Sequence, residues 1–372
     1  MAKQDDLSIT ANGQIVSGWQ EIRLTRGVER FPSDFDIVAT EKYPGSMSVV
    51  FQPGMRCEVK IGSTLVLTGY IDRVTPSFNA HQHTIRISGR SKCQDLMDCS
   101  ADIQAFGGQI NGATFVSLAQ QLCKPFGIQV TDLTAQVGVE PIKFETFSVN
   151  LGETPYEILE RVARSVGVLL YDDVDGNLVI SRIGKHAGEV RGVTEGINIQ
   201  SAGAAFCMDQ RYSHYIVVPT TVDTTGDVRQ SLNSGAGFAV ATSRDVGTPR
   251  YRPMIIVGEQ FQNGQSLSQA RADWENNRRW GRSQAARVTV DSWRDVDGRL
   301  WQPNTLVAMD IPTLYLSKKK WVLSEVTYSR GMTTGTTADM VLMPPEAFSI
   351  QPTTLSPYDW DRTQALQQGS QQ

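Results

Sequence analysis

Two histidines separated by one residue, His81 and His83, have the side chains and the spacing that could bind a metal ion. On an extended strand, residues two positions apart point to the same side, so both imidazoles would face one point. Protein metal sites usually need more than two ligands, and no third ligand is apparent nearby in the sequence. Asn79 and Ala80, just before them, indicate a loop. We therefore expect a loop edge here, and no metal or other cofactor.

An acidic segment, Asp172–Asn177, has the oxygen-rich composition of a calcium-binding loop. It lacks the regular Asp-x-Asp-x-Asp start and the glutamate at position twelve that such loops contain. Its Asp-Gly pair favours a tight turn between two strands instead. The same type of turn is predicted for Asp295–Gly298. Neither segment therefore predicts a calcium site.

The sequence contains no recognisable catalytic motif. A nucleophile elbow, a phosphate-binding loop and a zinc-protease helix each need a fixed pattern, and none of these patterns occurs. Two carboxylates could still converge in space, as in glycoside hydrolases, but nothing in the sequence favours a particular pair. We therefore predict that the protein is not an enzyme.

Arginine and tryptophan gather in one stretch of the C-terminal third. Both residue types are enriched at protein interfaces, so contact between subunits is our interpretation. The interface candidates are Trp274, Arg278, Arg279, Trp280, Arg282, Trp293 and Trp301. A solvated helix face would explain the arginines as well. A phosphate-binding patch is disfavoured because Asp273 and Glu275 dilute the positive charge.

Length and composition indicate a globular chain of several domains. The 372 residues are 40% hydrophobic and 20% charged, and the net charge of −4 gives no general signature of nucleic-acid binding. The five cysteines have irregular spacings and no C-x-x-C pair, which argues against a disulfide framework or a zinc site. No apolar run approaches the roughly 18 residues of a membrane helix, and the N-terminus has no apolar signal region. We therefore expect no stable membrane insertion.

One segment of the chain occurs twice. Phe51–Ile61 returns as Trp301–Ile311, and the two share Gln, Pro and Ile at matching positions. In each copy proline is followed by Gly54 or Asn304, which tolerate the left-handed backbone of a type II turn. A strand with alternating apolar residues follows the turn. The matching order of turn and strands predicts an internal duplication of a β unit.

The predicted fold class is α+β, mainly β, with two related β-barrel domains from the duplication and smaller α/β modules. Gly and Pro separate predicted strands that include Leu7–Ala11 and Arg56–Ile61. Helical periodicity predicts helices over residues 113–126 and 266–286. The predicted domains are a first barrel at 1–90, an α/β domain at 91–190, a second barrel at 191–219 with 286–348, an inserted loop and helix region at 220–285, and a polar tail at 349–372.

The linear pattern resembles the baseplate hub proteins of Mu-like contractile-tailed phages. The segments that carry the resemblance are Val28–Phe35, Trp274–Val290, Trp293–Asn304, Leu323–Tyr328 and Val341–Phe348. The resemblance extends over about residues 5–348. It includes no catalytic motif and therefore implies no catalytic residue.

The resemblance implies a virion protein that assembles in the host cytoplasm as a homotrimer related to the hub of T-even phages. Two related barrels per subunit would alternate around a ring that adapts a sixfold tail tube to a threefold central spike. The implied partners are further copies of the chain, the spike, the tube or a tube-end protein, other baseplate proteins, and DNA only in transit through an axial channel. The chain has no long β-helical repeat, so the spike would be a separate protein, which the tail at 349–372 could contact.

Two other functions stay open from the sequence. The first is a peptidoglycan hydrolase of the phage tail, and the second is a carbohydrate-binding β module. Neither has a motif that supports it.

Overall fold

The computed structural model describes residues 5–40, 51–79, 83–102, 109–111, 113–134, 146–148, 150–166, 168–181, 189–219, 240–258 and 265–348. The chain forms two compact units. The first contains residues 1–205 and 285–345, and the second contains residues 206–284 and 346–372. The fold is mainly β, as the sequence predicts.

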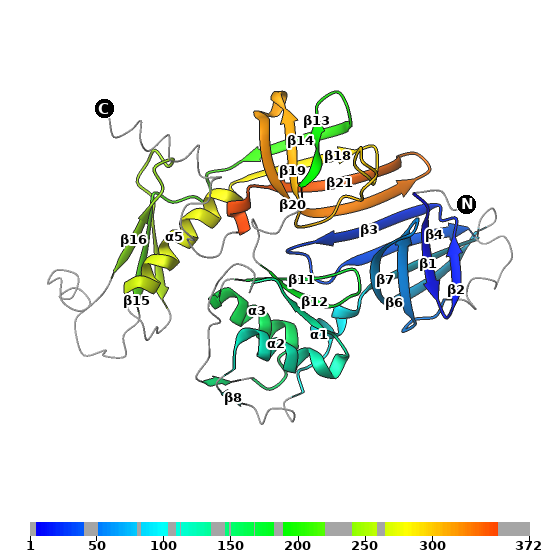
Figure 1. The fold of residues 1–372 in the computed structure, drawn as a ribbon, viewed down its shortest axis with the longest axis horizontal. Helices are drawn as coiled ribbons and strands as arrows, with labels where there is room; N and C mark the ends of the chain where they lie inside the picture. Colours follow the sequence, from blue (N-terminus) through cyan, green and yellow to red (C-terminus); the bar gives the residue numbers. More distant parts are fainter. Residues whose placement is uncertain are drawn as a thin grey trace. The chain divides into compact units, whose positions relative to one another are not determined.

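A sheet of thirteen strands dominates the first unit (Figure 1). Its N-terminal strands are β1 (Leu7–Ala11), β2 (Gln14–Ser17), β3 (Glu21–Gly27), β4 (Asp34–Thr40), β5 (Arg56–Ile61), β6 (Thr64–Phe78) and β7 (His83–Ser91). Its later strands are β13 (Glu189–Thr194), β14 (Ile199–Phe206), β18 (Gln284–Val290), β19 (Leu306–Ile311), β20 (Leu316–Gly331) and β21 (Gly335–Met343). The order is β14-β18-β21-β20-β3-β4-β7-β6-β5-β1-β2, and β19 pairs with β20 and β13.

Alternation of apolar and polar residues decides which face of each strand is buried. In β4, Phe35 and Ile37 are buried, whereas Asp34 and Asp36 lie on the opposite side. The apolar faces of the early and late strands join in one hydrophobic core. The large sheet therefore has a core face and a polar face.

The early and late strands repeat one pattern. The antiparallel series β5-β6-β7 has strands of 6, 15 and 9 residues, and β19-β20-β21 has strands of 6, 16 and 9 residues. The pairing shifts at equivalent places in the two copies, at Asp72 and at Ser324. The predicted left-handed turn residues are confirmed, with φ of 86° at Gly54 and 64° at Asn304. The shared strand order, bulge and turn support the predicted duplication.

The neighbours of the two copies differ. β1 runs antiparallel to β5, whereas β13 runs parallel to β19. Arg56 at the start of β5 is exposed, whereas its counterpart Leu306 is buried. The different neighbours explain why the second face of this strand diverged in sequence between the copies.

The prediction of two closed barrels needs correction, because the described strands close into no barrel. β3 of the first copy pairs with β20 of the second copy, in the register Thr25 to Thr327. In Figure 1 the blue β3 accordingly lies beside the orange β20. The reason is that backbone edges of the two copies bond to each other, so the copies form one open sheet rather than two separate rings.

An α/β module follows β7. It contains α1 (Asp95–Asp98), β8 (Gln109–Asn111), α2 (Phe115–Cys123), β9 (Val130–Asp132), β10 (Thr146–Ser148), α3 (Pro155–Val166), β11 (Leu169–Asp172) and β12 (Leu178–Ser181), with short 3-10 turns at Lys92–Gln94 and Lys124–Phe126. Thr114 caps α2, because its hydroxyl accepts from Ser117 N at 3.2 Å. Leu118, Leu159 and Ile180 are fully buried in a separate core, so the module packs around its own apolar residues.

The second unit is a three-stranded sheet with one long helix. Its elements are β15 (His214–Pro219), β16 (Ala241–Arg244), β17 (Pro253–Gly258) and α5 (Gln265–Arg282). Helix α5 packs on β15 and β16. The placement of residues 206–219 differs from the expectation that they belong to the second barrel, because β15 bonds to β16 and β17 instead of the large sheet. The predicted tail at 349–372 lies outside the described residues.

Two further 3-10 turns lie near the C-terminal strands, at Pro312–Leu314 and Pro345–Phe348. Among the described residues, no helix is both long and apolar enough to cross a membrane.

Candidate functional site

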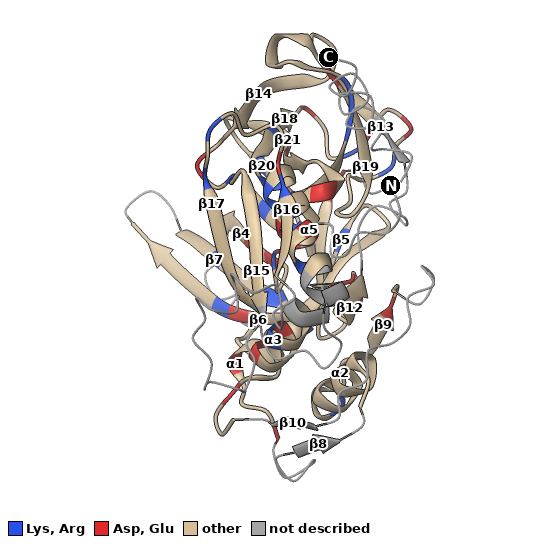
Figure 2. Ribbon diagram, turned by 90° about the vertical axis from the view of Figure 1, so that its left-hand side faces the viewer, with Lys and Arg blue, Asp and Glu red and all other residues tan. Residues whose placement is uncertain are grey.

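Side chains on the polar face of the large sheet form the main candidate interaction surface. Across the strands from β18 to β6, register places five arginines and five acidic residues on this face. Arg30 and Asp72, which line a groove in it, add one charge of each sign, so the formal charges cancel. The arginines are Arg23, Arg73, Arg86, Arg90 and Arg287, and the acidic residues are Glu21, Asp34, Asp36, Glu325 and Asp339. Figure 2 marks the basic and acidic residues on the ribbon of the whole chain, and both kinds occur in its strands and helices.

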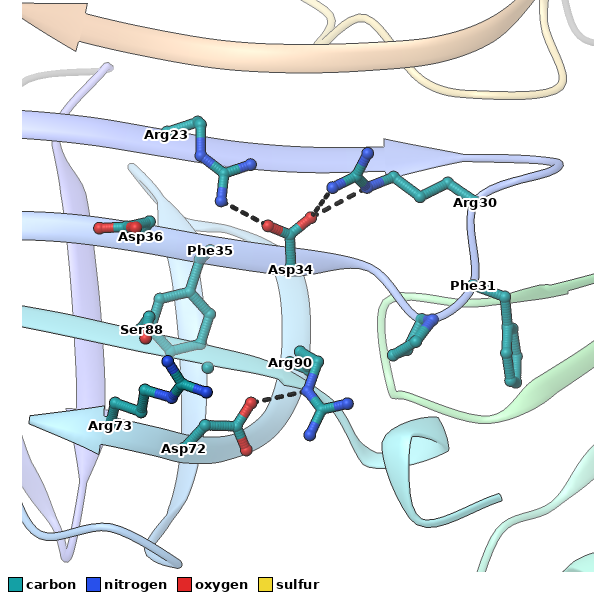
Figure 3. A pocket seen from close by; sticks show the side chains of 12 residues that line it. Arg23, Arg30, Phe31, Asp34, Phe35, Asp36, Asp72, Arg73, Ser88 and Arg90 are labelled. Atoms are coloured by element: carbon teal, nitrogen blue, oxygen red, sulfur yellow. Dashed lines mark hydrogen bonds and ion pairs between the residues drawn. The ribbon is translucent and has the colours of Figure 1, made fainter. Parts of the chain in front are cut away.

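Asp34 is held between two arginines (Figure 3). Arg23 Nη2 donates to Asp34 Oδ2 at 2.6 Å. Arg30, from the loop after β3, donates to Asp34 Oδ1 through Nε at 2.9 Å and Nη2 at 2.7 Å. Arg30 also lies 3.6 Å from the carboxylate of Glu325 on β20. These ion pairs therefore span both copies of the strand pattern.

Asp36 and Arg86 form a two-point pair across β4 and β7. Arg86 donates through Nε at 2.8 Å and through Nη2 at 2.7 Å to the two carboxylate oxygens. This hydrogen bonding raises the pKa of Arg86. The side chain of Arg86 is 64% exposed, but its guanidinium group is already bound to the carboxylate of Asp36.

Arg90 is bound by two carboxylates. It donates through Nε to Asp72 at 2.7 Å and through Nη2 to Asp98 at 2.6 Å. The hydrogen bonds that Arg90 donates to Asp98, and to a smaller extent to Asp72, raise its pKa against the effect of burial. Its charge therefore stabilises the junction between the large sheet and α1.

Hydroxyl groups continue the polar face across the two copies. Thr289 Oγ1 donates to Asp339 Oδ1 at 2.6 Å, and the hydroxyls of Thr25 and Thr327 lie 3.0 Å apart. Two grooves of about 560 Å³ and 950 Å³ hollow this face, and Arg23 and Asp36 line both. Asp34 and Asp36 in these grooves are held by arginines, and Asp339 in the larger groove accepts from Thr289, so these three carboxylates are already hydrogen-bonded rather than poised for acid–base catalysis.

Among the interface candidates of α5, Arg278 lies against the indole ring of Trp274, as does the neighbouring Arg271. The guanidinium of Arg271 lies 4.4 Å from the ring centroid of Trp274, and that of Arg278 lies 5.3 Å from it. Arg279 donates to Glu275 at 3.0 Å and to the side chain of Gln210 at 3.2 Å.

Trp274 and Trp280 are only partly buried and Arg282 is exposed, so this helix has surface available to a partner.

The last two candidates lie in the core of the first unit. Trp293 and Trp301 are 0% and 1% exposed. The indole of Trp293 donates to Ser329 O at 3.1 Å and to Thr337 O at 3.0 Å, and that of Trp301 donates to Ser292 O at 3.1 Å. These two rings hold the segment around the turn Asp295–Gly298 against the late strands. Their role is therefore to stabilise the fold.

The acidic segments considered for calcium binding form ordinary turns, whereas His83 is the first residue of β7 and lies opposite Phe78. Asp172–Asn177 joins β11 and β12, with Gly176 N donating to Asp173 O at 3.1 Å, so the predicted hairpin turn is confirmed. Asp295–Gly298 forms the second predicted turn, with Gly298 N donating to Asp295 O at 3.0 Å. His81 lies outside the described residues. Within the described part of the chain, no three His, Cys, Asp or Glu side chains gather as a metal site would need.

Sequence reasoning missed the ion-paired polar face. The available signal was the alternation of acids with buried residues in Asp34–Asp36 and of Arg86 and Arg90 with buried residues in β7. The pairs themselves depend on register between strands about 50 positions apart, which the pattern of one strand cannot supply.

Models of known families match three parts of the chain. The N-terminal domain of "Mu phage baseplate assembly protein GpP-like" matches residues 6–91, the second domain of "Baseplate hub protein gp44-like" matches 93–182, and the fourth domain of "Mu phage baseplate assembly protein GpP" matches 264–351. The chain is thus similar to phage baseplate proteins along most of its length.

Individual relatives agree. The baseplate hub protein gp44 of Escherichia phage Mu is 30% identical over 347 residues, which are 92% of this chain and 89% of that protein. The chain therefore belongs to the baseplate hub proteins of Mu-like phage tails, which are structural proteins of the virion.

Solved structures of tail proteins have the same fold. The 43 kDa tail protein of prophage MuSo2 from Shewanella oneidensis is 33% identical, with a TM-score of 0.78 over 93% of this chain and 100% of that chain. The tail protein from Neisseria meningitidis MC58 is 19% identical, with a TM-score of 0.75 over 93% of this chain and 99% of that chain.

Proposed function

We propose that three copies of this chain form a ring at the tip of a contractile tail. Each chain contributes two copies of the strand pattern, so three chains present six similar units. Such a ring can meet a sixfold tail tube on one side and a threefold central spike on the other. Its axial channel would let DNA leave during infection.

The observation that carries the proposal is a pair of unfilled strand edges. Within the chain, β20 of the second copy pairs with β3 of the first. The equivalent edges are Arg73–Phe78 on β6 and the outer edge of β14, and neither has a partner among the described strands. An unpaired strand edge can bind a strand of another chain. The free edge of β6 in one chain could therefore pair with the free edge of β14 in the next, as β20 pairs with β3 inside the chain.

Joining these edges between chains would close the sheet. The strands from β14 to β6 form two sets of four, one from each copy. If β6 of one chain pairs with β14 of the next, the two kinds of set alternate around the ring. Each set then has a set of the other kind on both sides. We therefore propose that one barrel closes between chains, in place of the two barrels within each chain that the sequence predicted.

The proposed partners are other copies of the chain, the separate spike protein, the tail tube or its end protein, and other baseplate proteins. DNA would be in transit only, and the ring would assemble in the host cytoplasm. We propose no enzymatic role, since the carboxylates Asp34 and Asp36 are both bound by arginines. The exposed part of α5 around Trp274, Trp280 and Arg282 would serve contacts to a neighbouring subunit or baseplate protein.

Light scattering on the purified chain tests the oligomer, with a mass of three times 41.0 kDa expected. A stable monomer at micromolar concentration would contradict the ring. Cysteine pairing tests the edges: in a background with Cys99 and Cys207 replaced by serine, Thr75→Cys on β6 is combined in turn with a cysteine at each position from Gln200 to Ala204 of β14. At least one combination should give disulfide-linked trimers, because opposed Cα atoms in a strand pair lie within disulfide reach.

Cell-wall zymography and a glycan-binding screen address the remaining functions. Clearing of cell wall by the purified protein would contradict a purely structural role.

A further inference from the structure

We propose that the polar face lines the axial channel and is charge-compensated, meaning that its positive and negative charges balance and that Arg23, Arg30, Arg86 and Arg90 are each held by carboxylates, so that DNA passes without binding. This inference rests on the proposed ring. It adds a property of the channel wall that can be measured on the purified chain.

The arginines that could bind phosphate already have carboxylate partners. Arg86 uses Nε and Nη2 on Asp36, and Arg30 uses the same two groups on Asp34. Arg23 shares Asp34 with Arg30. A guanidinium fork fits a carboxylate and a phosphate in the same way, so an approaching phosphate must displace the carboxylate.

The remaining charges on the face also balance. Arg73 and Arg287 have no carboxylate partner among the described residues, and the acids Glu21 and Asp339 have no arginine partner there. The face thus combines equal numbers of both signs over neighbouring strands. Phosphates of a passing duplex would meet alternating attraction and repulsion, which keeps net affinity low.

The shape of the sheet indicates which face would point to the axis. The two grooves lie on the polar face, whereas the opposite face is filled by the hydrophobic core. Because the opposite face is covered by that core, the polar face is the one left to line a ring of such sheets. The polar face is therefore the surface that DNA would meet.

The experiment compares DNA binding by the full-length wild type and by Asp34→Asn/Asp36→Asn, using a labelled double-stranded oligonucleotide and fluorescence anisotropy. The double variant removes the carboxylate partners of Arg23 and Arg86 and leaves Arg30 with Glu325 alone, while keeping an oxygen at each position. We expect weak binding by the wild type and binding at least about tenfold tighter by the variant at low salt. The plot of log affinity against log salt should steepen by about 0.9 for each phosphate newly contacted.

Two variants serve as controls. Glu58→Gln/Asp297→Asn removes the same number of negative charges from positions that form ion pairs with Lys60 and Arg299 instead of with the arginines of the polar face, and should leave DNA affinity close to that of the wild type. Asp36→Arg/Arg86→Asp inverts one pair without changing the net charge, and should also leave it unchanged. Asp36→Asn alone, which frees only Arg86, should give a smaller gain and tests the inference if the double variant does not fold.

Equal gains in the face variant and in Glu58→Gln/Asp297→Asn would overturn the inference, as would tight binding by the wild type. Light scattering on the same samples separates this result from the ring. A monomer that gains DNA affinity only when Asp34 and Asp36 are neutralised would support charge compensation and contradict the trimer.

Discussion

The carboxylate of Asp172 shows how burial sets the behaviour of single residues in this protein. It is 2% exposed and accepts from Ser33 N at 3.2 Å and from Ser33 Oγ at 3.0 Å. Burial raises its pKa, and the nearby charge of Arg26 acts in the opposite direction. The carboxyl group therefore joins β11 to the loop before β4, and ionising it in this buried position lowers the stability of the fold.

Replacing Asp172 with asparagine should change the pH dependence of stability. A folded-state pKa above the unfolded value of about 3.9 means that the stability from the protonated carboxyl is fully present below that pH and is lost as pH rises through the folded pKa. Asparagine cannot ionise, so the free energy of unfolding of Asp172→Asn, relative to that of the wild type, should increase from about pH 4 to pH 7. Urea denaturation at both pH values measures this, and a constant difference would argue against a raised pKa.

Thiol reactivity should divide the five cysteines by burial. Burial raises the pKa of Cys57 and of Cys123 to about 12, and it also raises the pKa of Cys93 well above its usual value. These thiols stay protonated near pH 8, whereas Cys99 and Cys207 are exposed. A thiol reagent should modify two groups per native chain and five after denaturation.

The serine double variant at Cys99 and Cys207 should give no fast reaction. Reaction of a third group in the native wild type would show that one of the buried sites opens.

At the scale of elements, glycines fix the turn of the repeat and the close approach of strands. Gly54 needs a left-handed backbone but has open space around it. Gly89 on β7 has no such space, because an added Cβ would lie 2.2 Å from Tyr70 O and 2.6 Å from Phe35 Cζ. Gly54→Ala should therefore cost about 1 kcal/mol, and Gly89→Ala about 3 kcal/mol or more. Thermal melts of both variants check the order, and a larger loss at Gly54 would show that backbone strain outweighs packing.

Local elements could be predicted from sequence because short-range signals decide them. Strands Leu7–Ala11 and Arg56–Ile61 have the predicted bounds, and the repeated turn uses the residues that favour it. The helix expected over 113–126 forms α2 over Phe115–Cys123, followed by a 3-10 turn. Alternation, proline and glycine act within a few residues, so a single sequence contains them.

Pairing between distant elements could not be predicted. Thr25 and Thr327 are 302 positions apart, and strand edges bond through backbone groups that all sequences share. For the same reason β15 was expected in the wrong sheet. The tryptophans were visible as a cluster in sequence, but only the fold separates the buried rings of Trp293 and Trp301 from the partly exposed Trp274.

At the scale of the whole molecule, the joint between β3 and β20 shows what the assembly would repeat. It forms once within the chain, and its equivalent requires a neighbour. A closed ring leaves none of these strand edges unpaired, which removes a route to aggregation. Because of the duplication, one chain contains both strands of the contact between β3 and β20, and its free edges at β6 and β14 are the equivalent two strands.

Proline substitutions on β14 should separate folding from ring closure. Adjacent residues of a strand direct their N–H groups to opposite edges, so Ser201→Pro and Ala202→Pro remove donors from different sides. One variant should weaken the pairing of β14 with β18 and lower the melting temperature. The other should keep the wild-type melting temperature of the chain fold but behave as a monomer in light scattering, with Ser201→Ala and Ala202→Ser remaining trimeric. If a proline variant at each of these two positions stays trimeric, β14 does not form the contact between chains, and the ring would have to close through another surface.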